Sequence, residues 1–474
     1  MRTDCTSDQL EFQGLGRRRV VGRFDAGLTT SDAGGLVLLR EVAERTGWLR
    51  GFGGCFRDGR ARGRIEHTAL ELVSQRVLGI ALGYEDLNDH ETLRDDPLLA
   101  LAAGKSDVLG VERSRERDRG HALAGKSTLN RLEHGRGEAT RYHRIDHDDA
   151  AIERHFVDCF LGAHAEPPGQ IVLDFDATDD PLHGHQEGRF FHGYYGNYCY
   201  LPLYVFCDDH LLVAKLRPSN QDASAGAVEE LSRVVGQIRA RWPAVEITIR
   251  ADSGFAREAL MSWCEANQVH YVLGLARNAR LQRAIGGPLH EAKQRCEASG
   301  EAVRSFVELD YRTKKTWSRT RRVVAKAEAL PGKANPRFVV TSLAADRFPA
   351  KELYETIYCA RGDMENRIKE QQLALFADRT STATIRANQL RLWFSSMAYV
   401  LIAQLRRRGL AGTELARAQA GTLRLRLFKI AALVRLSARR LVISFSSAYP
   451  LQTLFTTALA NLQHVSLQPN APAH

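Results

Sequence analysis

Long hydrophobic runs and cysteine patterns are both missing from this sequence. No apolar run of about 18 residues or more occurs, which excludes a membrane-spanning helix of ordinary length. The N-terminal residues contain no apolar segment like that of a secretion signal. The eight cysteines are scattered and form no CxxC pair, which argues against a zinc site and against a disulfide framework. We therefore expect a protein of the reducing cytoplasm that has no membrane partner.

Acidic residues are scarce in one part of the chain. The 474 residues carry a formal net charge of +10, and residues 379–440 contain thirteen Lys and Arg but a single acid, Glu414. An excess of this size indicates a polyanionic partner, most often nucleic acid, and a basic protein without such a partner is the alternative. Because arginine neutralises phosphates, we predict that this stretch, including the arginines at 406–408 and 439–440, faces phosphate groups.

A strand is missing in front of GHALAGKS, residues 120–127. The letters match a phosphate-binding loop, which lies between a buried strand and a helix and needs glycines, a lysine and a hydroxyl group. The preceding VERSRERDRG is too charged to form a buried strand. We therefore predict no ATP site. We expect a turn that leads into a helix capped by Ser127 or Thr128, with Lys126 available to a phosphate of DNA.

The signals for secondary structure change along the chain. Apolar residues recur at helical spacing up to about residue 165, where a junction containing two prolines follows. Strand and helix patterns then alternate to about residue 280, which predicts a mixed α/β sheet. Residues 281–345 resemble strands with basic faces, and two long helices are expected over 346–410. The tail, 411–474, contains the strand-like TLRLRLFKIAALV and RRLVISFSS and a short final helix.

Carboxylates occupy unusual positions in two of the expected strands. Asp174 and Asp176 lie two residues apart in IVLDFDATDDP and therefore share one face of a strand. Buried carboxylates need a cation or a partner, so the pair indicates either a metal site or a salt bridge. Asp252 follows the strand VEITIRA, at the end where active-site residues of α/β sheets are common. A turn-initiating role before Ser-Gly is the alternative for Asp252.

A third acid lies on an expected helix. Tyr358, Arg361, Glu365 and Lys369 follow one another at spacings that place them on one helix face. This face is either simply solvated or presents a metal-binding oxygen among groups that bind phosphate. Two hard divalent cations suit a set of Asp and Glu oxygens, and two such ions promote in-line phosphoryl transfer. In a basic protein, the substrate would be a nucleic-acid backbone.

Together these residues resemble a known family. The blocks LDFDATDD, IRADSGF and Tyr358-x2-Arg361-x3-Glu365 resemble the three signature blocks of DDE-type transposases of bacterial insertion sequences, and the insertion sequence thirteen-eighty family most of all. Blocks such as FHGYYGNYCYLPLYVF, LRPSNQDAS and RTSTATIRANQLRLWFSSMAYVLIAQLR extend the similarity over nearly the whole chain. The resemblance implies an α/β fold with an RNase H-like mixed-sheet catalytic core, split by a β-rich insertion and preceded by a helical N-terminal DNA-binding region.

The implied domains follow the sequence signals. They are the DNA-binding region (1–165), the first part of the core (166–280), the β-rich insertion (281–345), the second part of the core with its acidic helix (346–410), and a basic C-terminal hairpin and tail (411–474).

The resemblance also assigns roles to residues. It implies that Asp176, Asp252 and Glu365 are catalytic and bind two Mg²⁺ ions, for which Mn²⁺ would substitute, and Asp174 remains a further or alternative ligand. The DNA-binding residues that we expect are Tyr358, Arg361, Lys369, Trp317, Arg250 and Lys126. One position departs from the family, because Gln372 stands where relatives have a lysine. For Trp317, stacking on a displaced base competes with packing inside a small sheet of its own.

The function implied is DNA transposition. The enzyme would bind the terminal inverted repeats of an insertion sequence, cleave DNA at the element ends and join the freed 3′-OH ends to target DNA. It would act on double-stranded DNA as a homodimer, without ATP, in the bacterial cytoplasm near the nucleoid. A structure-selective RNase H-like nuclease without strand transfer and an inactive DNA-binding regulator are the alternatives. The histidines at 183, 185 and 192 lack zinc-site spacing, which favours a loop facing the substrate.

Overall fold

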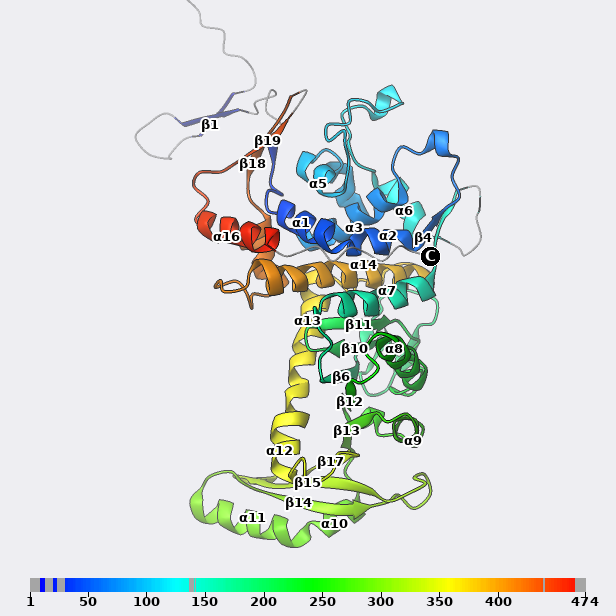
Figure 1. Ribbon diagram of the computed structural model, residues 1–474, viewed down its shortest axis with the longest axis vertical. Coiled ribbons are helices and arrows are strands. Elements are labelled where there is room, and N and C mark those ends of the chain that lie inside the picture. The colour runs from blue at the N-terminus through cyan, green and yellow to red at the C-terminus, as the bar shows by residue number, and fades with distance from the viewer. Residues whose placement is uncertain are drawn as a thin grey trace, which may run out of the picture.

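The computed structural model describes residues 9–12, 20–23, 30–135, 140, 142–437 and 440–464, the first two segments by their backbone alone. The body is elongated (Figure 1). A helical region lies at one end, a long horizontal helix separates it from a sheet, and the sheet continues to the far end of the molecule. Near the N-terminus, β1 (Gln9–Phe12) and β2 (Val20–Arg23) pair antiparallel.

The first region is helical, as the sequence predicts. The clearest case is α3, which begins after Thr68 with a reciprocal capping box to Glu71 and ends at Gly83, where φ is +100°. Its main helices are α1 (Leu36–Thr46), α2 (Trp48–Gly54), α3 (Ala69–Leu82), α4 (His90–Leu93), α5 (Pro97–Ala102), α6 (Lys126–Glu133) and α7 (Asp149–Gly162). The short strands β4 (Phe56–Asp58) and β5 (Ile145–His147) pair within it.

The GHALAGKS segment has no strand in front of it in the described part of the chain. A 3₁₀ turn (Glu116–Asp118) precedes it, so the expected absence of a strand at this place is confirmed. The predicted caps are wrong, however, because α6 begins at Lys126 and its N-cap residue is Gly125, not Ser127 or Thr128. The Lys126 backbone amide donates to Glu91 at 2.8 Å, and its ammonium group donates to Asn88 at 3.1 Å.

The second region is a mixed α/β unit around a nine-stranded sheet. The strand order is β11-β10-β6-β12-β13-β17-β15-β14, with β16 paired to β15. The strands are β6 (Gln170–Ala177), β10 (Leu203–Cys207), β11 (His210–Lys215), β12 (Glu246–Ala251), β13 (His270–Leu275), β14 (Val303–Tyr311), β15 (Arg321–Leu330), β16 (Lys333–Ala334) and β17 (Arg337–Thr341). Only β6, β12 and β13 pair as parallel neighbours.

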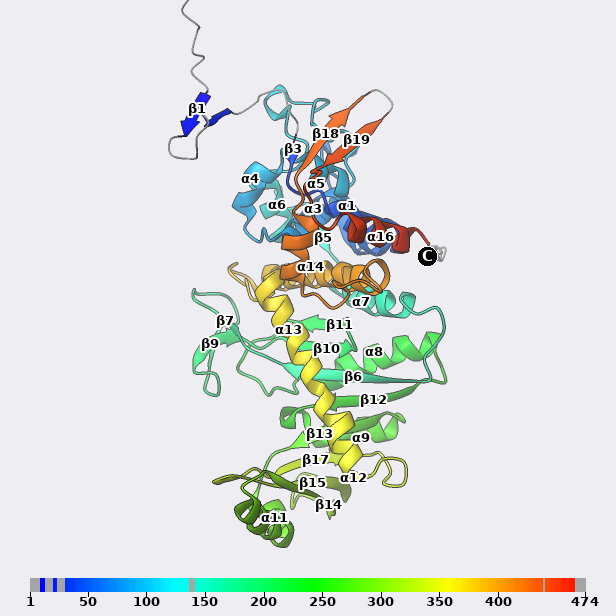
Figure 2. The ribbon, with the colours of Figure 1, turned by 90° about the vertical axis from the view of Figure 1, so that its left-hand side faces the viewer.

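The alternation of residues in β6 sets the two faces of the sheet. Ile171, Leu173 and Phe175 pack in a core with residues of α8 (Ala227–Arg241) and α9 (Glu258–Ala266). Asp174 and Asp176 therefore point to the opposite face. The long helix ending in α13 crosses this second face (Figure 2).

The expected β-rich insertion extends the main sheet. Three of its strands, β14, β15 and β17, occur where the sequence predicts them. Because β17 pairs antiparallel with β13, the insertion forms no separate sheet. Two helices that the sequence analysis did not identify, α10 (Ala279–Ala284) and α11 (Gly286–Ser299), belong to the same segment.

The acidic helix is irregular in its first half. It starts as α12 (Ala350–Glu352), continues as a π-helix (Leu353–Tyr358) and a 3₁₀ turn (Cys359–Arg361), and becomes regular only in α13 (Gly362–Leu375). Such irregular turns inside helices are frequent at functional sites. Here they change how residues before and after Arg361 are spaced around the helix axis.

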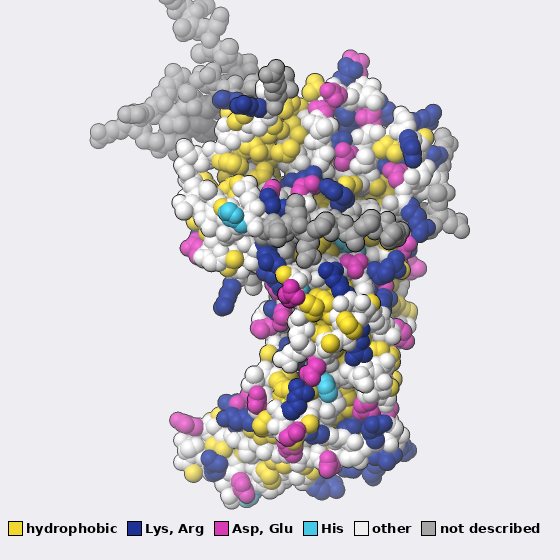
Figure 3. Space-filling view, in the orientation of Figure 1, with side chains coloured by type: hydrophobic (Ala, Val, Ile, Leu, Met, Phe, Trp, Pro, Cys, Tyr) yellow, Lys and Arg dark blue, Asp and Glu magenta, His cyan; other side chains and the backbone are white. Residues whose placement is uncertain are grey.

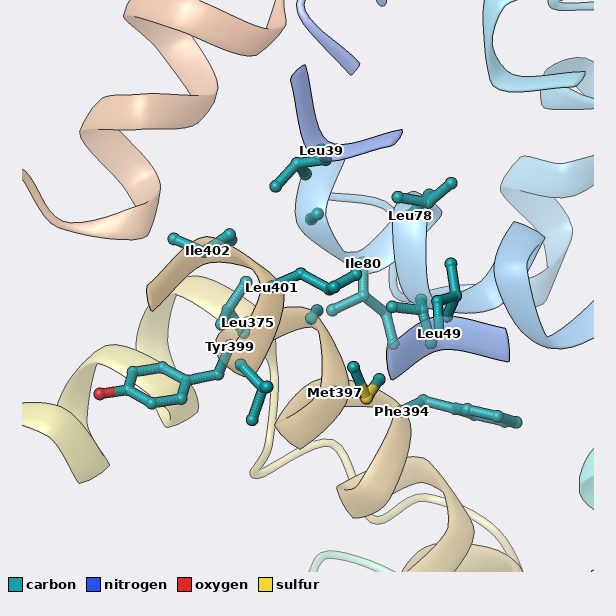
Figure 4. Close-up of a cluster of buried hydrophobic side chains, with 14 of the residues drawn as sticks. Leu39, Leu49, Leu78, Ile80, Leu375, Phe394, Met397, Tyr399, Leu401 and Ile402 are labelled. Carbon is teal, nitrogen blue, oxygen red and sulfur yellow. The ribbon is translucent and has the colours of Figure 1, made fainter. Parts of the chain in front are cut away.

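Helix α14 (Ile385–Gln404) connects the two regions. It is buried on nearly all sides, as expected of a helix that is apolar all round. In the core, Phe394, Met397 and Leu401 of α14 lie near Leu49 and Ile80 of the helical region (Figure 4). No helix among the described residues is long and apolar enough to cross a membrane.

The C-terminal segment combines helical turns with a small sheet. After a π-turn (Leu405–Gly409), the sequence TLRLRLF forms α15 (Ala420–Leu423) and a second π-turn (Arg424–Phe428), so the predicted strand there is wrong. The sequence TLRLRLF alternates apolar and basic residues as a strand would. The segment is nevertheless helical, because Leu423, Leu427 and Phe428 are buried together at helical spacing. A hairpin of β18 (Ala432–Leu436) and β19 (Leu441–Phe445) follows, with β3 (Thr30–Ser31) beside β18, and then α16 (Gln452–Gln463).

Most arginines of the basic stretch bond inside the protein. Arg386 bonds Asp146 and Asp149, Arg391 bonds Glu133, Arg406 bonds Glu370, Arg407 bonds Asp209, and Arg408 and Arg424 donate to backbone carbonyls. The prediction that residues 379–440 form a phosphate-facing surface is therefore wrong for these side chains, because acids or backbone carbonyls of other segments hold them. Arg439 lies outside the described residues. On the face shown in Figure 3, Lys and Arg are interspersed with Asp and Glu.

Candidate active site

Two of the predicted acids lie side by side at one edge of the sheet. Strands β6 and β12 run parallel, and the pairing of Phe175 with Ala251 places the next residues, Asp176 and Asp252, beside each other. Neighbouring strands lie about 4.8 Å apart. Asp252 also accepts a hydrogen bond from the Gly254 amide at 2.8 Å, so it initiates a turn as well as lying at the site. The turn holds the Asp252 carboxylate at the strand end.

The third acid reaches the same place from the acidic helix. Arg361 donates to Glu365 Oε1 at 2.6 Å, and its Nη1 lies 3.7 Å from Asp176 Oδ1. One guanidinium group therefore joins the acid of the sheet to the acid of the helix. The side chain of Glu365 is 43% exposed, whereas that of Asp176 is 16% exposed, so the site opens on the helix side.

Negative charge exceeds positive charge among Asp176, Asp252, Glu365 and Arg361. Burial raises the pKa of Asp176 to about 7, with Asp252 and Glu365 adding to the increase and Arg361 opposing it. Burial lowers the pKa of Arg361, but the carboxylates of Asp176 and Glu365 outweigh this effect and raise it overall. A further cation near the three carboxylates would relieve their mutual repulsion.

The donor chemistry of the site suits a hard divalent cation. Carboxylate oxygens from Asp176, Asp252 and Glu365 are ligands that Mg²⁺ and Mn²⁺ prefer. In the described part of the chain, no three acidic, histidine or cysteine side chains already stand in the geometry of a metal site. The guanidinium group of Arg361 lies between two of the acids. The residues therefore fit such ions by type and charge, once Arg361 turns towards another anion.

Tyr358 also belongs to the site. A Cβ atom on Gly274 would lie 2.6 Å from the Tyr358 hydroxyl oxygen and 2.9 Å from the backbone nitrogen of Ser253. The absence of a side chain at Gly274 thus lets the tyrosine approach the turn that holds Asp252. Burial raises the pKa of Tyr358, and Asp252 contributes to the increase. Gly274 was not identified from the sequence, because nothing in the strand pattern distinguishes it.

Asp174 and Arg250 form a separate, buried ion pair. Arg250 donates from Nε and Nη2 to the two oxygens of Asp174 at 2.5 and 2.7 Å, and from Nη1 to the Ile357 carbonyl at 2.5 Å. This pairing matches the salt-bridge alternative for Asp174. It differs from the expected role of Asp174 as a metal ligand and from that of Arg250 in DNA binding. The pair instead anchors the irregular helix that carries Glu365 to the strands that carry Asp176 and Asp252.

The remaining predicted DNA-binding residues are distributed over the molecule. Trp317 is 4% exposed and packs edge-on against Tyr311 with 5.6 Å between ring centroids, so its ring is enclosed and not offered to a base. Lys369 is exposed on α13. Lys126 is the first residue of α6 and belongs to the helical region, not to the sheet that carries Asp176 and Asp252. Gln372, at the position where relatives carry a lysine, donates to the Asp179 carbonyl at 3.2 Å and so fastens α13 beside the site.

The histidines at 183, 185 and 192 form no metal site, either together or with other residues that the structure describes. His185 bonds Arg189 at 3.1 Å, and His192 lies against Tyr195 with 4.9 Å between ring centroids. His192 ends β8 of a small sheet of β7 (Asp180–Pro181), β8 (Phe190–His192) and β9 (Asn197–Tyr200), and His183 and His185 lie in the connection between β7 and β8. It projects from the molecule beside β6 (Figure 2).

Comparisons with known proteins address the family of the chain. No curated protein matches the chain. A solved structure described as the piggyBac transposase synaptic complex with hairpin DNA is similar over 83% of this chain and 79% of that chain, at 13% identity and a TM-score of 0.38. The family model described as transposase DDE domain group 1 matches residues 12–467. The chain therefore belongs to the family of the transposase DDE domain, group 1.

Proposed function

We propose that the protein cleaves DNA at the ends of an insertion sequence and joins the 3′-OH ends to target DNA. The observation that carries the proposal is the meeting of Asp176, Asp252 and Glu365 from two parallel strands and a crossing helix. The five strands β11-β10-β6-β12-β13 support an RNase H-like core, since an antiparallel meander is followed by two parallel strands.

Each residue of the site has a definable task. Asp176, Asp252 and Glu365 would hold divalent cations, Mg²⁺ or Mn²⁺. When bound, two such ions supply positive charge to the attacking and leaving oxygens of an in-line displacement at a phosphodiester. Arg361 donates a hydrogen bond to Glu365 and lies 3.7 Å from Asp176, and it would turn towards a DNA phosphate, which guanidinium groups bind well. Tyr358 holds the Asp252 turn in place from the far side.

The remaining parts of the proposal concern partners. Lys369, exposed on α13 beyond Glu365, would contact the phosphate backbone of the same DNA. The substrate would be double-stranded DNA with terminal inverted repeats, bound in part by the helical region. Two element ends require two active sites, so we propose a homodimer on DNA. Exchange of phosphodiester bonds needs no nucleotide hydrolysis, so the proposed reaction includes no ATP.

The test is a strand-transfer assay with a labelled element end, target DNA and Mg²⁺. We expect joined product from the wild-type protein and a decrease of roughly 10²–10³-fold or more with Asp252→Asn, as for loss of a group that stabilises transition-state charge. Asp346→Asn, which changes an exposed acid on another loop, is the matched control. Binding to the element end should persist in both variants.

Two results would favour other functions. Cleavage by the wild-type protein without any joined product would indicate a nuclease. Binding that is indifferent to metal, with neither cleavage nor joining, would indicate a DNA-binding regulator. Full activity of Asp252→Asn would reject the site itself.

A further inference from the structure

The hairpin of β8 and β9 carries an unusual set of exposed aromatic rings. Of the six exposed aromatic side chains among the described residues, four lie within residues 190–198, namely Phe190, Phe191, Tyr194 and Tyr198. Tyr194 is 86% exposed and Phe191 57%. Single exposed aromatic residues are ordinary, but a cluster of them marks an interaction surface.

The backbone that presents these rings is firmly held. Ser219 donates to the Phe190 carbonyl at 2.9 Å, and the Leu182 amide donates to the Tyr198 carbonyl at 2.8 Å. The buried Tyr200 donates from its hydroxyl to the Glu187 carbonyl at 2.5 Å. At the tip, the Gly196 amide donates to the His192 carbonyl at 2.8 Å, and Gly196 adopts a φ of +69° that favours glycine. The rings are therefore displayed by a fixed support.

The aromatic tip is connected to the candidate active site. Tyr194 contacts Tyr195 edge-on, with 5.0 Å between ring centroids. The Tyr195 hydroxyl donates to the carbonyl of Ala177, the residue after Asp176, at 3.3 Å. Asn197 on β9 donates to Asp179 at 3.2 Å. A continuous row of contacts thus leads from the exposed ring to the strand end that carries the first acid.

A second group of rings lies on the same hairpin. Phe191 and Tyr198 are direct cross-strand partners and meet edge-on, with 5.5 Å between centroids. The guanidinium carbon of Arg189 lies 3.9 Å from the centroid of the Tyr198 ring. No acidic residue occurs within 190–198. The surface therefore combines flat aromatic faces with positive charge, which is the composition of sites that bind unpaired nucleotides.

We propose that the β8–β9 hairpin is a stacking platform for unpaired DNA bases next to the phosphodiester that the acids would cleave. The inference rests on the proposed function, because the site beside the hairpin identifies the occupant as DNA. Tyr194 and Phe191 would stack on bases, and Arg189 would contact a neighbouring phosphate. Trp317, the aromatic residue expected for this task, is buried, so the hairpin offers the accessible rings near the acids. The platform predicts a preference for DNA ends with an unpaired overhang over fully paired ends.

The experiment measures equilibrium binding with the full chain in the Asp252→Asn background, so that cleavage does not interfere. The probes are a DNA duplex with a single-stranded overhang containing 2-aminopurine and the fully paired duplex of the same sequence. We expect quenching of the 2-aminopurine fluorescence on binding. Tyr194→Ala should weaken binding of the overhang about 5–150-fold, the range for loss of one stacked base. It should change binding of the paired duplex less than about twofold.

Three further variants separate stacking from other contacts. Tyr194→Phe should retain the affinity, whereas Tyr194→Leu, which keeps apolar area but no aromatic ring, should lose it. Phe445→Ala removes an exposed aromatic ring outside the helical region and the β8–β9 hairpin and is the matched control. Equal loss for both duplexes, or full affinity in Tyr194→Leu, would overturn the platform. Because the assay needs no catalysis, failure of strand transfer would reject the proposed function and leave this result standing.

Discussion

Charged side chains are arranged in opposite ways in the helical region and at the sheet edge. In the helical region, the fully buried Glu133 accepts hydrogen bonds from Arg76 and Arg391, both at 2.8 Å, so two cations surround one acid. At the sheet edge, three acids surround Arg361. The first cluster ties together α3, α6 and α14, whereas the second retains unneutralised negative charge.

The difference shows why the sign of charge along the sequence is a poor guide to surfaces. Residues 379–440 are almost free of acids, yet Arg386, Arg391, Arg406 and Arg407 pair with acids outside the stretch and become structural. Asp176 lies in a largely apolar strand beside Asp252 and Glu365, and such a surplus of like charge is costly unless function requires it. A cluster with balanced partners stabilises the fold, and a cluster with an excess of one sign is ready to bind an ion or a ligand.

The largest expected effect on stability is at Glu133. Glu133→Gln leaves Arg76 and Arg391 without their shared counter-charge inside the protein. We expect the free energy of unfolding to fall by about 3–5 kcal/mol, as for other buried ion pairs that lose one partner. Denaturant unfolding followed by circular dichroism measures it. A decrease below about 1 kcal/mol would show that the Glu133 cluster does not stabilise the fold as a neutralised cluster should.

A smaller contrast is expected between two acids of one strand. Asp174→Asn removes the partner of the buried Arg250 and should lower the free energy of unfolding by roughly 2–4 kcal/mol. Asp176→Asn should not lower it at pH 8 without metal, because the carboxylate lies buried near two other acids. Thermal and denaturant unfolding of both variants tests the contrast. Equal destabilisation would indicate that Asp176 is also structural.

Acidification should affect the helical region through a buried histidine. Burial, followed by the charge of Arg76, lowers the pKa of His90 from 6.5 to about 3. The folded protein then binds fewer protons than the unfolded chain, so the stability from neutral His90 is complete above pH 6.5. It is lost as the pH falls from 6.5 towards 3, by at most about 1.4 kcal/mol per pH unit.

The measurement is unfolding at several pH values in wild type and His90→Gln, with the exposed His290→Gln as a control for the loss of a histidine. His90→Gln should flatten the pH dependence between pH 6.5 and 5. An unchanged slope would mean that other groups control the acid response.

The smallest effect is expected for an ion pair at the surface. Arg426 and Glu414 lie 2.7 Å apart, but their side chains are 47% and 60% exposed. Arg426→Ala should change the free energy of unfolding by less than about 1 kcal/mol, since solvent screens such pairs. A loss as large as that of Glu133→Gln would contradict the distinction between buried and exposed pairs.

Much of the candidate site could be predicted from local patterns. The period of two in β6 places Asp174 and Asp176 on one face, and the strand ending at Ala251 places Asp252 at its edge. The pairing of Asp174 with Arg250 could not be predicted, because it depends on the register between β6 and β12. The irregular turns before Arg361 were also missed, since helical spacing alone assumes a regular helix.

The sequence by itself determined most strands of the main sheet, the presence of the acidic helix and the place of Asp176 and Asp252 at the strand ends, because these follow from short-range periodicity and motif spacing. Only the tertiary structure decided which charged groups are neutralised. It enclosed Trp317, paired the basic stretch with distant acids, and left aromatic rings exposed on the β8–β9 hairpin. The physical reason is that solvation and electrostatic energy depend on neighbours in space, which long-range packing alone brings together.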